Sequence, residues 1–285
     1  MKKNNYFLKI LIILFSYPSL YIPTTIIFLF CIISFFAPYL SPYNPNEFVG
    51  NPIEPPQKLY ILGTDPVGRD ILSRIIYGSR ISLSIGLIST LISTLVSTLF
   101  AILAGLYKGY IDTIIMRITD GFLAFPTIII ALGIISITEP SILSISIAIS
   151  LSFTPKLLRI IRSEVMIVIN SNYVEAARAI GISNLNLTYT TILPNIMSPI
   201  LVGFSVFFST AVILEAGLSF LGFGVTPPTA TWGYMINRGF VFIRQAPWIS
   251  VFPGIAIFIF ALSLNRLGDS IRDIFDPRMN IRSDL

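Results

Sequence analysis

Enzyme chemistry needs residue types that this chain largely lacks. Histidine is absent, Cys31 is the only cysteine, and no Gly-Lys dipeptide occurs in the 285 residues. The first two absences remove the commonest general base, the histidine-based nucleophile triads and the commonest metal ligand. The third removes the P-loop, in which a lysine after glycine contacts nucleotide phosphates. Carboxylate or Ser–Lys chemistry stays open, but we predict no catalytic, cofactor or metal site and expect any ATP hydrolysis to occur in another subunit.

The most informative spacing lies between residues 172 and 194. Asn172 followed by Glu175 predicts a capping box, with a helix that begins at Asn172. Gly181 suits the position just after a helix end because glycine adopts positive φ without steric cost. Ser183 can then cap a second helix that runs towards Pro194. The segment therefore predicts a helix of about two turns, a sharp turn and another helix.

This short helix presents Ala176, Ala177 and Ala179, which are small enough to let another surface approach closely. A two-turn helix with little apolar surface is barely stable alone in water, so contact with a partner is physically expected. An ordinary connector between two membrane helices is the alternative interpretation. The residues of this segment alone do not separate the two.

The rest of the chain must position that segment, and its composition is that of a membrane protein. Hydrophobic residues make up 54% and charged residues 12%, whereas soluble domains carry about 25% charged residues. The mean hydropathy is +0.82. Apolar stretches separated by short charged clusters recur along the whole length, which predicts one all-α, polytopic membrane domain over residues 1–285.

Six stretches approach the roughly 20 apolar residues that a spanning helix needs. They cover residues 22–38, 81–106, 121–138, 140–158, 196–214 and 248–264. An outer loop over 39–80 and a cytoplasmic segment over 159–195 connect them. The amino terminus resembles a signal peptide, but no small-residue cleavage site follows it, so we expect an uncleaved first span.

The distribution of basic residues predicts the orientation of the chain in the membrane. With both termini inside, the outer segments hold six of the 19 Lys and Arg residues, namely Lys58, Arg69, Arg74, Arg80, Arg238 and Arg244. This distribution obeys the positive-inside rule and places the segment 159–195 in the cytoplasm. Because the positive charge lies at the ends of apolar runs, the net charge of +5 orients helices and does not indicate nucleic-acid binding.

The 172–194 segment resembles the EAA motif of ABC importer permeases, whose short coupling helix docks on an ATP-binding subunit. The matching residues are Glu175, Ala176, Ala177, Gly181, Leu193 and Pro194. The resemblance departs from the usual pattern at Thr191, where an isoleucine is common. It implies that Glu175 holds the helix together, that the alanines allow close docking, and that Gly181 sets the turn.

Three other blocks are similar to the dipeptide, oligopeptide and nickel permease family, and most similar to its C-type subunit. They are LGTDPVGRDILSR at 62–74 with YGSR at 77–80, EAGLSFLGFG at 215–224 with PP at 227–228 and WG at 232–233, and LGD at 267–269 with RD at 272–273 and DPR at 276–278. The resemblance covers about residues 35–280. Taken alone, the Gly-Thr-Asp and Gly-Arg-Asp turns are typical of structural loops.

The resemblance implies a six-helix type I ABC importer permease in a bacterial inner membrane. Its expected partners are a B-type permease, two ATP-binding subunits that bind ATP and Mg²⁺, an extracytoplasmic solute-binding protein and membrane lipid. Peptide is the expected solute, with nickel or another small solute as the alternative. The resemblance leaves open whether the second permease is a different chain or another copy. Transport would proceed by alternating access.

Other residues admit two interpretations. Ser89, Ser93, Ser97, Ala101 and Gly105 form a small-residue ladder that favours close helix packing, with a polar solute path as the alternative. Glu215 is either a gate or solute contact, or a residue at the outer end of a span. Lys156, Arg159 and Arg162 share one helix face, which predicts contact with lipid headgroups or, less favoured, with the ATPase.

Two rival functions have separate signatures. A secondary transporter driven by an ion gradient predicts buried carboxylates or broken helices at mid-membrane, and Glu215 is the one clear sequence candidate. A membrane sensor or scaffold predicts a sizeable soluble output domain, for which the composition shows no sign.

Overall fold

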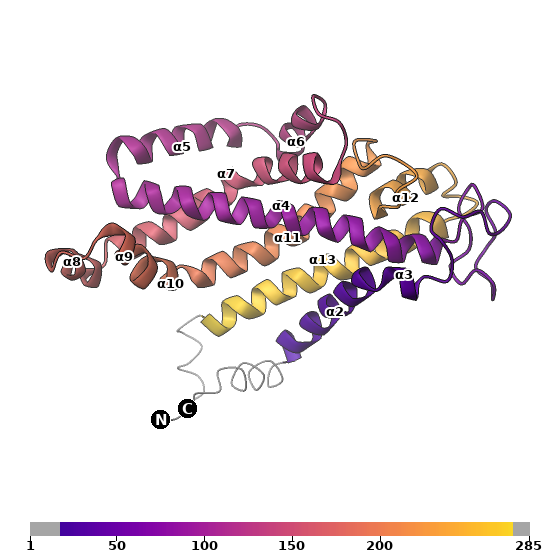
Figure 1. Ribbon diagram of the computed structural model, residues 1–285, viewed down its shortest axis with the longest axis horizontal. Coiled ribbons are helices and arrows are strands. Elements are labelled where there is room, and N and C mark those ends of the chain that lie inside the picture. The colour runs from indigo at the N-terminus through magenta and orange to yellow at the C-terminus, as the bar shows by residue number, and fades with distance from the viewer. Residues whose placement is uncertain (1–17, 276–285) are drawn as a thin grey trace.

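The computed structural model describes residues 18–275, and these form an elongated bundle of long helices (Figure 1). The signal-like segment at residues 1–17 and the DPR block at 276–278 lie outside this range. The six longer apolar elements are α2 (Pro18–Phe35), α4 (Ile71–Tyr107), α5 (Gly109–Leu123), α7 (Ile142–Ile169), α11 (Met197–Phe220) and α13 (Trp248–Phe275). The shorter ones are α3 (Ala37–Leu40), α6 (Thr127–Ile135), α8 (Asn172–Ala179), α9 (Asn184–Leu187), a π-helix η1 (Thr188–Ile192), α10 (Leu193–Asn195) and α12 (Trp232–Phe240). Between residues 18 and 275 there is no β-strand, only one isolated bridge from Thr64 to Asp70.

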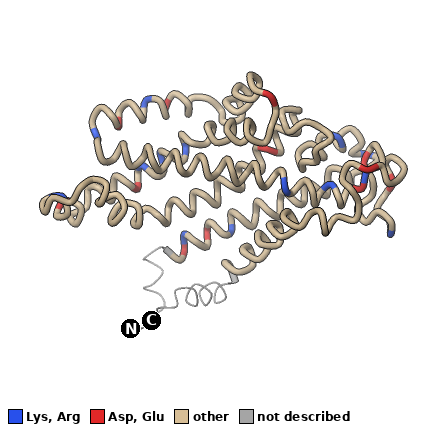
Figure 2. The backbone as a smooth tube through the Cα atoms, viewed as in Figure 1, with Lys and Arg blue, Asp and Glu red and all other residues tan. Residues whose placement is uncertain are grey.

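The two ends of the bundle differ. Helices α8 and α9 lie at one end, whereas the irregular segment 41–70 and α12 lie at the other (Figure 1). The long middle parts of α4 and α11 carry no charged residue between these ends (Figure 2). Four helices in the described range are long and apolar enough to cross a membrane, and the bent pair α5–α6 brings the number to five. The segment Ser19–Phe35 is a shorter apolar helix.

The small-residue ladder of α4 packs against α7, as the first of its two interpretations predicts. All five of its residues are buried. Ser93 Oγ donates to the Ser150 carbonyl at 2.9 Å, and Ser97 Oγ donates to the Thr154 carbonyl at 3.0 Å. At Gly105 a Cβ atom would lie 2.5 Å from Val165 Cγ1. Small side chains therefore bring the two helices close enough for hydroxyl groups to bond directly to the neighbouring backbone.

The predicted single helix over 121–138 is wrong. Helix α5 ends at Leu123, α6 begins at Thr127, and their axes differ by 88°. Pro126 stands at the break, where it cannot donate a backbone hydrogen bond and disfavours helical geometry in the preceding residue. The chain also reverses between α4 and α5, at Lys108 and Gly109, which both have positive φ.

Other boundaries differ because polar residues find partners. Helix α4 begins at Ile71 instead of residue 81, since Asp70 accepts from the Ser73 amide at 2.7 Å and caps it. The loop predicted over 39–80 therefore ends at residue 70. Helix α7 continues to Ile169, beyond the predicted end at 158. The number of membrane crossings and their borders stay predictions.

Two basic residues of α7 have acidic partners on α5. Arg159 pairs with Asp120, and Arg162 forms two bonds with Asp112. Arg159 and Arg162 therefore have partners within the chain, and their contact with lipid headgroups stays a prediction. Intramolecular pairing lowers the cost of continuing a helix through charged residues, and it ties α5 to α7.

Candidate functional site

Helix α8 follows directly from α7 and lies at the extreme end of the bundle (Figure 1). Its first helical residue is Asn172 and its N-cap is Ser171, which makes no side-chain cap bond. Instead, Ser171 Oγ donates to the Val168 carbonyl at 2.5 Å at the end of α7. The predicted capping box between Asn172 and Glu175 is therefore wrong, because Asn172 lies one position too far into the helix to cap it.

The predicted turn at Gly181 is confirmed. Gly181 has φ +83°, and no described atom lies within 4 Å of the position that a Cβ would occupy. The Ile182 amide donates to the Ala177 carbonyl at 3.2 Å, and the Gly181 amide donates to the Arg178 carbonyl at 3.0 Å. This bonding pattern is the Schellman end of a helix, and it depends on the left-handed backbone of Gly181. Ser183 then caps α9 by accepting from the Asn186 amide at 3.4 Å.

The six predicted coupling residues do not share one exposed face. Glu175, Ala176 and Pro194 are exposed, as is Gly181. Ala177 and Leu193 are partly buried and pack against the main apolar core. Ala177 thus contributes to holding α8 in place, whereas Ala176 is available to a partner. The role given to Glu175 by the resemblance stays a prediction, since it has no bond in the described part of the chain that would hold α8 together.

Only one side chain of α8, Val174, is fully buried. Around the turn lie exposed apolar residues that sequence reasoning missed. Ile180 is 79% exposed and Tyr173 is 51% exposed, and Leu185 and Tyr189 are exposed farther along. The sequence signal that could have found them was the position of Ile180 directly before Gly181, which ends the helix. We name Tyr173, Ala176, Ile180, Leu185 and Tyr189 the α8 surface.

Glu215 lies inside α11, which continues to Phe220, six residues beyond the predicted span end at 214. The side chain is 0% exposed, and Ser219 Oγ donates to its Oε1 at 2.7 Å. Its Oε2 has no partner among the described residues. Gly233 of α12 packs beside it, since a Cβ there would lie 2.6 Å from Ala216 Cα. In this conformation Glu215 is a buried carboxylate of α11, next in sequence to the residue on which α12 packs.

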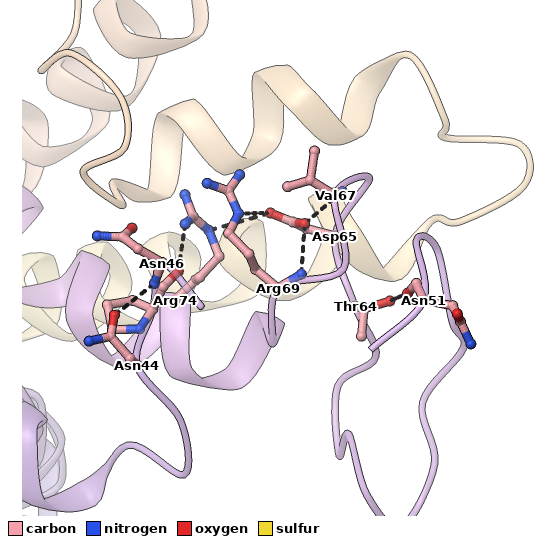
Figure 3. A network of polar contacts seen from close by, with 9 residues as sticks. Asn44, Asn46, Asn51, Thr64, Asp65, Val67, Arg69 and Arg74 are labelled. Atoms are coloured by element: carbon pink, nitrogen blue, oxygen red, sulfur yellow. Dashed lines mark hydrogen bonds and ion pairs between the residues drawn. The ribbon is translucent and has the colours of Figure 1, made fainter. Parts of the chain in front are cut away.

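A polar network holds the segment 41–70 on the start of α4 (Figure 3). Asp65 pairs with Arg69 at 2.7 Å and lies 3.7 Å from Arg74 Nε. Arg74 is 1% exposed, and its Nη1 donates to the Pro45 carbonyl at 2.8 Å. Arg69 and Arg74, which the sequence analysis counted only for the orientation of the helices, therefore also anchor this segment.

Comparison with known proteins agrees with this architecture. Residues 97–281 match the family model described as "Binding-protein-dependent transport system inner membrane component". The chain belongs to this family. The match makes it a multi-pass membrane protein, and the matched range contains the α8 surface and Glu215.

Curated members of the permease family are similar over most of the chain. The di/tripeptide transport system permease protein DppC of Pseudomonas aeruginosa is 39% identical over 89% of this chain and 86% of its own length. The dipeptide transport system permease protein DppC of Escherichia coli is 40% identical over 87% and 85%. The glutathione transport system permease protein GsiD of Pectobacterium atrosepticum is 37% identical over 87% and 83%.

Two solved structures share the fold. An amino acid ABC transporter chain superposes with a TM-score of 0.56, covering 72% of this permease and 95% of that chain at 16% identity. A chain of the MetNI methionine ABC transporter, in an inward-facing conformation, gives a TM-score of 0.55, covering 70% and 97% at 15% identity. The expected all-α fold of a type I ABC importer permease is confirmed.

Proposed function

We propose that this permease forms the translocation path for di- or oligopeptides in an ATP-driven importer and couples to separate ATPase subunits through the α8 surface. The observation that carries the solute class is the 37–40% identity to permeases named for dipeptides, di/tripeptides and glutathione. Nickel or another small solute is the weaker alternative because these relatives are named for peptides. An ion-driven secondary transporter is disfavoured by membership of a binding-protein-dependent family.

The geometry of α8 supports a mechanical role. Its buried Val174 and partly buried Ala177 fix it to the bundle, while Ile180 and Tyr173 are exposed at its end. An exposed apolar group on a short helix gains free energy when a groove covers it. Helix α7 leads from α8 into the bundle and packs along α4, so a push on α8 moves α7 and α4 together.

The α8 surface faces the cytoplasm of a bacterial cell, where two ATP-binding subunits hold ATP and Mg²⁺, and both termini lie on that side. The segment 41–70 faces outwards, towards an extracytoplasmic solute-binding protein. A second permease, expected to be a B-type chain, completes the path. This chain itself contributes no catalytic residue or cofactor.

The test is peptide uptake by the complete importer in proteoliposomes. We expect Ile180→Asp to lower peptide-stimulated ATP hydrolysis and labelled dipeptide uptake by about tenfold, because a charge replaces the apolar contact. Ile137→Asp is the matched control, since Ile137 is also exposed but lies in the turn after α6, outside the α8 surface and the segment 41–70. Normal uptake by Ile180→Asp would contradict the coupling role. Uptake of nickel without dipeptide would contradict the solute class.

A further inference from the structure

A cavity of about 420 Å³ opens at the end of α4 that lies opposite α8. Its floor is one face of α4, because Tyr77, Arg80 and Ser84 are spaced by about one helical turn. Its volume falls in the range of about 300–1,000 Å³ that is usual for small-ligand sites. Neither the α8 surface nor Glu215 contributes to it.

One wall of this cavity is the turn Asn44–Pro45–Asn46. Buried Arg74 holds the turn by donating to the Pro45 carbonyl at 2.8 Å (Figure 3). Within the turn, the Asn46 amide donates to Asn44 Oδ1 at 3.0 Å. This wall is therefore anchored by groups that need no ligand.

The opposite wall is formed by Thr229 and Ala230, which precede α12. The fully buried Trp232 fixes them to α4: its amide donates to Ser82 Oγ at 3.3 Å, and its Nε1 donates to the Ile75 carbonyl at 3.0 Å. Both walls are thus bonded to the helix that supplies the floor, so the cavity is part of the folded structure.

The charge of the cavity is positive and unbalanced. Arg80 is exposed, and no acidic group pairs with it within residues 18–275. None of the residues that line the cavity is acidic. By contrast, Arg69, Arg159 and Arg162 each have a carboxylate partner.

An exposed guanidinium in such a cavity is suited to a carboxylate, which it binds through two parallel hydrogen bonds. The other polar groups are amides and hydroxyls, which can bond to peptide groups without selecting a side chain. Another cavity, of about 540 Å³ and formed by the segment 41–70, is lined by Glu54 and by no basic residue, so it lacks this chemistry.

We propose that the cavity around Arg80 receives the free C-terminal carboxylate of the transported peptide at the outer mouth of the permease. This assignment rests on the proposed peptide function and outward orientation. Arg80 binds the carboxylate, while Asn44, Asn46, Ser84 and Thr229 contact the adjoining peptide group.

The test uses the complete importer in proteoliposomes with labelled Ala-Ala and its C-terminal amide. Each peptide is supplied at the concentration that gives equal measured occupancy of the binding protein. At this equal occupancy, wild type should import the acid about tenfold faster than the amide. Arg80→Gln should lose about tenfold on the acid and nothing on the amide, and Arg80→Lys should recover part of the loss. Arg244→Gln, which removes another exposed arginine of the same end, should match wild type.

The outcomes separate the explanations. An equal loss on both peptides would indicate that Arg80 contacts the binding protein or lipid headgroups instead of the peptide carboxylate, and it would overturn the proposal. Unchanged uptake of the acid by Arg80→Gln would overturn it as well. If an assembled wild-type importer hydrolyses ATP but imports neither peptide, the peptide function itself fails, which is a different result from a selective failure at Arg80.

Discussion

The turn at Gly181 offers a quantitative test of coupling. A side chain at this position meets no described atom of this chain, so within the permease a substitution acts through the backbone. At φ +83° an ordinary L-residue loses about 1–2 kcal/mol relative to glycine. Asparagine tolerates this conformation better than alanine, and a β-branched residue tolerates it least.

That penalty is large for so small an element. Helix α8 has eight residues and one fully buried side chain, so little tertiary contact opposes its opening. If Gly181 leaves the left-handed region, the bond from the Ile182 amide to the Ala177 carbonyl is lost as well. A cost of about 1–2 kcal/mol lowers the population of the intact turn by about 5- to 30-fold relative to the open state.

The assay is peptide-stimulated ATP hydrolysis by the purified complete importer, normalised to the amount of assembled complex. We expect activity to fall in the order Gly181, Gly181→Asn, Gly181→Ala, Gly181→Val, with Gly181→Val at least about fivefold below wild type. Gly121→Ala is the control, since Gly121 also has an open Cβ position but no positive φ. Wild-type hydrolysis in Gly181→Val, or equal loss in the asparagine and valine variants, would refute the backbone explanation.

Three further predictions concern the bundle. Arg162→Gln should leave Asp112 partly buried without its partner and lower the stability of the purified permease by about 1–3 kcal/mol, and exchanging the two charges should recover part of its thermal midpoint. Gly86→Leu should lower the stability by about 1–3 kcal/mol in the same thermal assay, because a Cβ at Gly86 would already lie 2.6 Å from Val212 Cγ2. A variant as stable as wild type would show that α4 and α11 do not pack this closely. Glu215→Gln keeps the acceptor for Ser219 and should retain dipeptide uptake within about twofold, whereas a loss above about tenfold would instead support a gate at this carboxylate.

Some features followed from short stretches of sequence. Apolar composition predicted the helical membrane fold, because a segment in lipid must satisfy all of its backbone hydrogen bonds internally, as an α-helix does. The turn at Gly181 was predictable from one residue, since few residues other than glycine adopt that φ readily. The ladder from Ser89 to Gly105 predicted close packing because its spacing places small side chains on one helix face.

The capping box shows where local reasoning failed. The motif at Asn172 and Glu175 satisfies the sequence pattern, yet α7 ends close enough for Ser171 to become the N-cap. The register of a short helix is set by where the preceding helix stops. That stop depends on contacts with the rest of the bundle.

Sequence alone therefore determined the class of fold, the place of the short helix α8 and the turn that ends it. Only the tertiary structure decided the partners of Arg159 and Arg162 and the surroundings of Arg80. Helix propensity and apolar spacing act within a few residues, so they can be read along the chain. The two ion pairs join residues that are 39 and 50 positions apart, and such residues meet only after the helices have packed. The same holds for the residues that line the cavity around Arg80.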